Sequence, residues 1–130
     1  MTHPIDAYMT YDRALTSGDM PGLAAALHAD AVWHQPGDHP LSGDHVGQDA
    51  VMALLGGFME RSGGTFALSK SAPPMVNGAY VAVLVSFSAT REGRAPLDMA
   101  GVDVFRVEDG LIREVWLYSA DQSVEDEFWA

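Results

Sequence analysis

The sequence predicts one α+β domain, residues 1–130, in which helices pack on one face of a curved antiparallel sheet. Stretches with the apolar spacing of helices come mainly first, and stretches rich in β-branched and aromatic residues come mainly later. The clearest of the later stretches runs from Met99 to Tyr118. It contains Asp109-Gly110, a dipeptide that favours a two-residue hairpin turn. With 130 residues, 48% of them hydrophobic, the chain can bury a substantial core.

The first part of the chain predicts two helices joined by a short turn. Apolar residues spaced three and four apart favour a first helix over Pro4–Ser17, with the proline in its first turn. Gly18 is expected to end this helix, because glycine readily adopts the left-handed backbone of a helix end. Asp19 can cap a second helix within residues 20–29.

The next elements are a strand, an irregular loop and a third helix. Residues 31–35 are β-prone and predict the first strand, which Pro36-Gly37 ends. The turn-rich loop that follows is expected to hold at most a short strand around residues 39–41. An apolar stripe then predicts a third helix over Gln48–Arg61, which should lie across the sheet.

The remaining sequence predicts strands and one short final helix. Residues 65–72 and 79–90 have the composition of strands, with a turn at Asn77-Gly78 between them. The hairpin ending at Tyr118 follows. Residues 121–129 then form an acidic amphipathic tail that is expected to be a last turn of helix docked against the domain.

Charge and composition exclude several classes of function. The net charge is −11, with 18 acidic residues against 7 Lys and Arg, so there is no basic patch for a nucleic acid or an anionic membrane. A neutral or cationic small molecule is compatible with this charge. The absence of cysteine excludes disulfides, thiolate metal sites and a cysteine nucleophile. No membrane span or secretion signal is evident, so we expect a cytoplasmic protein.

Asp103 is the first candidate functional residue. The two-residue period of a strand places it on the same face as Gly101, Phe105 and Val107. A carboxylate in this apolar company must find a partner, or its pKa must rise so that it becomes a neutral hydrogen-bond donor. The alternative is an edge-strand aspartate whose side chain reaches water.

Several motifs follow the predicted order of elements: the segment Tyr11–Asp19, Asp30-Ala31-Val32, Gly43–Ala50, the segment Asp103–Arg106, and Asp109-Gly110. Together they resemble the nuclear transport factor two-like superfamily, and most closely its SnoaL-like and ketosteroid-isomerase-like branch. The resemblance implies a cone-shaped, cystatin-like fold in which sheet and helices enclose one deep, mostly apolar pocket. It also implies a homodimer in many members, but no single chemistry.

The resemblance implies roles for specific residues. In the isomerases of this branch, a tyrosine on the first helix and a protonated aspartate on the penultimate strand donate hydrogen bonds to an enolate oxygen; Tyr11 and Asp103 match these positions. The general-base aspartate just before the proline that ends the first strand is replaced here by Gln35. Glutamine cannot accept a proton near neutral pH, which argues against a steroid isomerase unless another residue serves as base.

Two residues are candidates for the missing base. His34 has a suitable ordinary pKa of about 6.5, but strand alternation directs it to the face opposite Gln35. Asp121 follows the last strand and resembles the acid/base aspartate of SnoaL-like polyketide cyclases. It is an equally good N-cap for the tail helix.

The walls of the implied pocket have candidates as well. Gln35 and the apolar residues Trp33, Phe58, Met59, Phe105 and Leu117 are predicted to bind a ligand, although each apolar residue could equally be plain core. The histidines at positions 28, 39 and 45 are dispersed, without the spacing of a helical metal site, so no metal and no cofactor are predicted.

Two classes of function remain open. The first is an isomerase or cyclase that acts on a neutral apolar carbonyl compound, such as a polyketide, a terpenoid or a steroid-like molecule. The second is a non-catalytic protein that binds an apolar ligand, or a dimeric partner module. We expect a homodimer in either case, because Trp116 and Tyr118 alternate with Val115 and Leu117, so that both faces of the last strand are apolar.

Overall fold

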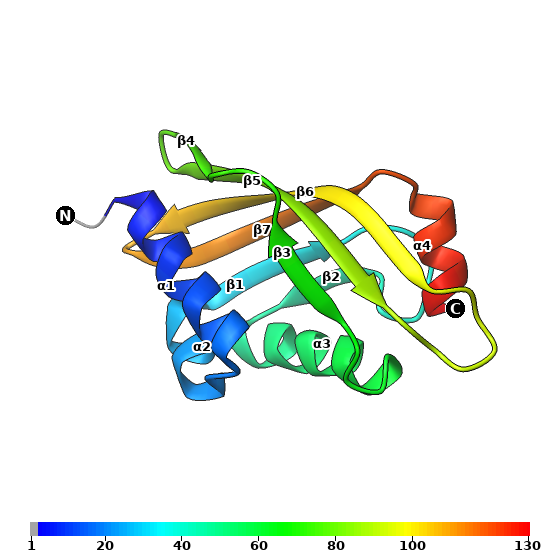
Figure 1. Cartoon of the computed structure of the whole chain (residues 1–130). Helices are drawn as coiled ribbons and strands as arrows, with labels where there is room; N and C mark the ends of the chain where they lie inside the picture. Colours follow the sequence, from blue (N-terminus) through cyan, green and yellow to red (C-terminus); the bar gives the residue numbers. More distant parts are fainter. Residues whose placement is uncertain (1–2) are drawn as a thin grey trace.

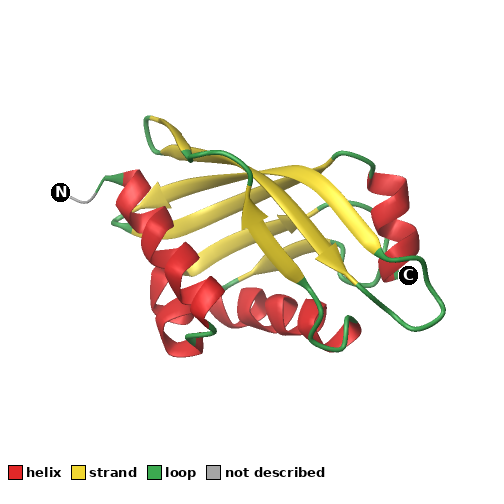
Figure 2. Cartoon of the chain, in the orientation of Figure 1, coloured by secondary structure: helices red, strands yellow, loops and turns green. Residues whose placement is uncertain are grey.

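The computed structural model describes residues 3–130 and contains one curved sheet with helices around it (Figures 1 and 2). The helices are α1 (Pro4–Ser17), α2 (Met20–Ala26), α3 (Gln48–Arg61) and α4 (Gln122–Trp129). The strands are β1 (Leu27–Gln35), β2 (Gly43–Val46), β3 (Ala67–Lys70), β4 (Met75–Asn77), β5 (Tyr80–Ala89), β6 (Leu97–Glu108) and β7 (Leu111–Ser119). This content confirms the predicted α+β class.

The strands form one sheet in the order β2-β1-β7-β6-β5-β3, and β4 pairs with β5 as well. The prediction of a purely antiparallel sheet is wrong at one place, because β1 and β7 are parallel. These two strands are far apart in the sequence and no hairpin links them, so local turn signals could not reveal their direction. The sheet is therefore mixed, with one parallel pair inside an otherwise antiparallel arrangement.

Local signals set the predicted boundaries. Gly18 ends α1 with a left-handed φ of 72°, and the Asp19 side chain accepts a hydrogen bond from the Gly22 N–H at 3.0 Å, which caps α2. Asp109 and Gly110 have φ values of 55° and 73°, as the tight turn between β6 and β7 requires. α1 and α3 begin and end at the predicted residues, so their predicted bounds are confirmed.

Other boundaries differ from the predictions. The second helix ends at Ala26, because the next residue already pairs with β7. No strand forms at residues 39–41, since Ser42 N–H donates to the His39 carbonyl at 2.9 Å and closes a turn; β2 begins directly after it. β3 is shorter than the expected strand over 65–72, and β4 has no counterpart in the prediction.

The two faces of the sheet have different surroundings. Along β5 and β6, alternate side chains are buried beneath the helices, where α1 contacts β5, β6 and β7 and α3 contacts β1 and β2. The outward face carries large apolar side chains that are exposed, with Leu84 at 38%, Tyr80 at 46% and Tyr118 at 60%. Within residues 3–130, no helix has both the length and the apolar character needed to cross a membrane.

Candidate active site

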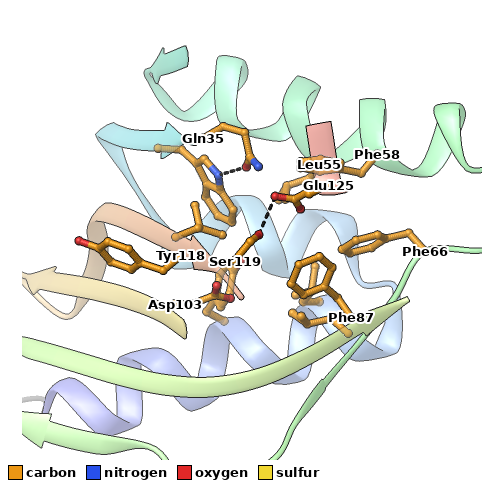
Figure 3. A pocket seen from close by; sticks show the side chains of 14 residues that line it. Gln35, Leu55, Phe58, Phe66, Phe87, Asp103, Tyr118, Ser119 and Glu125 are labelled. Carbon is orange, nitrogen blue, oxygen red and sulfur yellow. Dashed lines mark hydrogen bonds between the residues drawn. The ribbon is translucent and has the colours of Figure 1, made fainter. Parts of the chain in front are cut away.

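A cavity of about 70 Å³ lies between the inner face of the sheet and the helices α1, α3 and α4 (Figure 3). Most of its wall is aromatic or aliphatic and includes Trp33, Phe58, Phe66, Phe87 and Leu117. A few polar side chains also reach it, among them Tyr11, Gln35, Asp103, Ser119 and Glu125. An apolar cavity with a few converging polar groups is typical of a site for a small molecule.

Asp103 lies on the inner face of β6 and is only 7% exposed, which confirms its predicted apolar surroundings. No group among the described residues donates a hydrogen bond to its carboxyl. Burial raises its pKa from the ordinary 3.8 to about 7, and the negative charge of Glu125 contributes to the rise. A large part of Asp103 is therefore protonated near neutral pH and can donate a hydrogen bond.

Tyr11 reaches the same cavity from α1. Its ring packs on Phe105, with centroids 5.4 Å apart, and the residue is 3% exposed. Burial, together with the charge of Asp103, holds the pKa of the Tyr11 hydroxyl well above its usual value. The structure therefore brings Tyr11 and Asp103 together as two groups that carry protons at neutral pH.

Glu125 is an acidic residue of the cavity that was not predicted from the sequence. It lies on α4, is 5% exposed, and accepts hydrogen bonds from Ser119 Oγ at 2.7 Å (Figure 3) and from Gln122 Nε2 at 3.1 Å. Burial raises the pKa of Glu125, and these two hydrogen bonds act in the opposite direction. A signal was present, because Glu125 is three and four residues from Phe128 and Trp129 and so shares their buried helix face.

Asp121, one of the two candidates for the base, lies outside the cavity. Its side chain accepts a hydrogen bond from the Val124 N–H at 3.2 Å and caps α4, and the residue is exposed. The carboxyl of α4 that reaches the cavity belongs to Glu125, one helical turn later. Asp121 thus fixes the start of the helix that carries Glu125.

His34, the other candidate, lies on the outer face of the sheet. Its ring bonds to Asp44 at 2.7 Å and to Glu114 at 2.5 Å, and it stacks on Trp116. Burial lowers the pKa of His34, but the two carboxylates outweigh it and the net shift is upward. The neighbouring Gln35 faces the cavity, as strand alternation requires.

The Gln35 side chain is 6% exposed, and its Oε1 accepts a hydrogen bond from Trp33 Nε1 at 3.0 Å. This bond orients the amide so that its NH₂ group is the part left for a ligand. Gln35 can therefore donate a hydrogen bond but cannot take up a proton.

The predicted wall residues divide into two groups. Trp33, Phe58 and Leu117 line the cavity. Phe105 lies behind Tyr11 in the core, and Met59 is 44% exposed on the far side of α3. Other members of the wall were not predicted from the sequence, namely Leu15, Leu55, Phe66, Leu68, Phe87 and Ser119. Tyr118 also borders the cavity, but its side chain lies on the outward face of the sheet and is 60% exposed.

One group of possible metal ligands is found among the described residues, formed by His28, Glu108 and Asp109. His28 Nδ1 accepts a hydrogen bond from the Asp30 N–H at 3.0 Å, so a neutral ring carries its proton on Nε2. That nitrogen lies 3.7 Å from Glu108 Oε2, which is within the range of an ion pair but too far for a hydrogen bond. Glu108 and Asp109 are exposed, and exposed acidic groups are common without a metal.

Comparisons with known proteins agree with this architecture. A protein of unknown function with a cystatin-like fold from Xanthomonas campestris is 44% identical, with 99% of each chain covered and a TM-score of 0.92. Bal32a, from a soil-derived mobile gene cassette, is 28% identical over 98% of this chain and 96% of its own, with a TM-score of 0.91.

A more distant structure is IdmH, a proposed polyketide cyclase from Streptomyces antibioticus. It shares the fold at 21% identity, with a TM-score of 0.73 over 92% of this chain and 93% of its own. The SnoaL-like domain itself matches residues 6–115, most of the chain. The chain therefore belongs to the SnoaL-like family.

Proposed function

We propose that the protein is an acid/base enzyme of the isomerase or cyclase type that acts on a neutral, apolar carbonyl compound. The observation that carries the proposal is that two buried carboxyl groups with different surroundings, Asp103 and Glu125, share one apolar cavity. Membership of the SnoaL-like family and the likeness of the fold to IdmH support a ligand-binding or cyclase-like role.

The hydrogen bonds assign different roles to the two carboxyls. Glu125 accepts two hydrogen bonds, which favour its ionised form, whereas nothing donates to Asp103 in residues 3–130. Carboxyls whose surroundings push their pKa values apart can act as an acid and a base at the same pH. Glu125 is therefore the base, and neutral Asp103 is the hydrogen-bond donor.

A reaction follows from these roles. Glu125 removes a proton from the carbon next to a carbonyl group, and the electron pair moves onto the carbonyl oxygen. Tyr11 and Asp103 donate hydrogen bonds to that oxygen as its negative charge develops. Where the substrate has a carbon–carbon double bond next to the carbon that loses its proton, the resulting dienolate takes the proton back from Glu125 at the far end of that bond, which is an isomerisation. Where the substrate has a second carbonyl group, the enolate carbon attacks it and the new oxyanion takes the proton from Glu125, which closes a ring.

The lining of the cavity supports one class of substrate. Its ionisable groups, Tyr11, Asp103 and Glu125, are all acidic, and no Lys or Arg of the described chain lines it. A carboxylate or phosphate would be repelled there, while a neutral ketone has no charge to be repelled and can accept hydrogen bonds from Tyr11 and Asp103. The aromatic rings of Phe66 and Phe87 suit a flat or cyclic carbon skeleton.

The test is exchange of protons next to a carbonyl group in D₂O, followed by NMR with a panel of small cyclic ketones. Glu125→Gln removes the base and should slow exchange by about a hundredfold or more. Asp103→Asn keeps the shape but weakens the donor, and should also cost on the order of a hundredfold. Glu60→Gln, which removes an exposed carboxylate from α3, is the matched control and should exchange at the wild-type rate.

Equal rates for the wild type and Glu125→Gln across the panel would refute the proposal. If the same ketones still changed the fluorescence of Trp33 in the cavity wall, the non-catalytic alternative would hold. The apolar lining and the Gln35 amide, which cannot act as a base, are the features that favour that alternative.

A further inference from the structure

Three arginines converge on the end of α4, the helix that carries Glu125. Arg61 is the last residue of α3, while Arg91 and Arg94 lie in the loop between β5 and β6. Figure 1 shows this loop beside α4 and the C-terminal residue, at the end of the sheet where β6 begins. We refer to Arg61, Arg91 and Arg94 as the arginine clamp.

The clamp satisfies the carbonyl groups that the end of a helix leaves without partners. Each of the last four carbonyls accepts a guanidinium N–H: Glu127 from Arg94 at 2.6 Å, Phe128 from Arg91 at 2.6 Å, Trp129 from Arg61 at 3.3 Å, and Ala130 from Arg91 at 3.1 Å and Arg94 at 2.7 Å. The positive charges also suit the negative end of the helix dipole. Neither effect involves the cavity wall directly.

α4 depends on such contacts because it is short. It has 8 residues, and an isolated helix of this length is unstable in water. Glu125, Phe128 and Trp129 form its buried face, and the Trp129 ring packs against Phe58 and Phe66 at centroid distances of 5.1 and 6.0 Å. The aromatic contacts hold the helix against the core, and the clamp fixes its end.

We propose that the arginine clamp is a positioning device that holds the Glu125 carboxylate inside the cavity, opposite the groups that bind the substrate oxygen. The residues of the clamp touch α4 and not the cavity, so they act through Glu125. This inference rests on the proposed function, because it assumes that the position of Glu125 matters for proton transfer. A competing account makes the clamp a source of stability alone, with the Phe128 and Trp129 rings sufficient to place the helix.

The test replaces two members of the clamp in the double variant Arg91→Met/Arg94→Met. The readout is the titration midpoint of the Asp103 carboxyl, followed by ¹³C NMR, since the charge of Glu125 and the cover provided by α4 both raise it. The midpoint should fall from about 7 toward the ordinary value, in the same direction as in Glu125→Gln. Ketone exchange should fall by about a hundredfold, because misplacement of a catalytic group by about 1 Å has an effect of that size.

Arg13→Met is the matched control. It removes an exposed guanidinium from α1, which donates a hydrogen bond to Thr10 Oγ1 at 3.4 Å and lies outside the cavity, and should leave both the midpoint and the exchange rate unchanged. Circular dichroism shows whether the double variant is folded. If it is not, the single variant Arg61→Met, which loses one 3.3 Å hydrogen bond, is measured in the same way with the same criteria.

A folded variant with a wild-type Asp103 midpoint and wild-type exchange would overturn the inference and leave the clamp a stabilising feature. Failure of the proposed function gives a different pattern. In that case the wild type itself shows no exchange, while the Asp103 midpoint still falls in the clamp variant because Glu125 has left the cavity.

Discussion

Charged residues on the two faces of the sheet have opposite surroundings. On the outer face, His34 lies between Asp44 and Glu114, and Glu114 also accepts a hydrogen bond from Arg106 at 3.2 Å. On the inner face, Asp103 has no hydrogen bond from any described residue and shares its cavity with a second acid. Charged groups that neutralise one another in ion pairs have a structural explanation. A buried acid without compensation costs stability, and such costs are typical of functional sites.

The largest expected effect comes from removing the uncompensated charge. The pKa of Asp103 is higher in the folded protein than its ordinary value, so folding favours the neutral acid. Its contribution is therefore fully present at about pH 4 and is lost as the pH rises through about 7. Relative to Asp103→Asn, the wild type should lose on the order of a few kcal/mol of unfolding free energy between these limits.

Chemical denaturation of both proteins at several pH values measures this difference. Asp103→Leu, which has no ionisable group at this position either, should show the same pH profile as Asp103→Asn. Parallel profiles for the wild type and the variants would mean that Asp103 is ionised and stabilised by a partner.

The next effect concerns the apolar side chains of the outer face. We propose that this face forms a homodimer, because Leu84, Val102 and Tyr118 lie side by side across β5, β6 and β7 and are at least partly exposed. Leu84→Asp would place a charge in the interface and should yield monomers in light scattering at micromolar concentration. Met20→Asp, on an equally accessible side chain of α2, should not. A monomeric wild type would contradict the proposal.

The smallest effect is expected for the compensated charges. The pKa of His34 is raised, so its ion pairs stabilise the fold below about pH 6.5 and lose this contribution as the pH rises through its folded pKa. Because the group is partly exposed, His34→Gln should cost less than about 1 kcal/mol at pH 5 and nothing at pH 9. Thermal unfolding at the two pH values tests this. A larger loss that persists at high pH would show that stacking on Trp116 is the main contribution.

The same contrast explains what the sequence could and could not predict. Asp103 was recognisable because strand alternation is local, and the inward position of Gln35 follows from the same rule. Glu125 shares a helix face with Phe128 and Trp129, so its burial could have been read from the spacing. The position of Glu125 in the same cavity as Asp103 could not be predicted from the sequence, because it depends on where α4 docks. The contacts of the arginine clamp with α4 join residues that are far apart in the chain.

The family resemblance did not identify this carboxyl either. It implied an acid/base role for Asp121, at the end of the last strand, whereas the residue of α4 that reaches the cavity is Glu125, one turn later. The cavity wall shows the same pattern: Phe66 lies in the loop before β3 and Phe87 lies on β5, and only the three-dimensional arrangement makes them neighbours.

The parallel pairing of β1 with β7 has a consequence for how the molecule is made. β1 leaves the ribosome well before β7, but β7 is one of its two neighbours in the sheet. Contacts so distant in sequence are slow to form, because a long loop must close before they bring any gain. Until β7 is synthesised, one edge of β1 has no partner and the wall that contains Trp33 and Leu117 is open. The nascent chain therefore exposes an unpaired strand edge between the synthesis of β1 and that of β7, and the cavity closes only after β7 has been made.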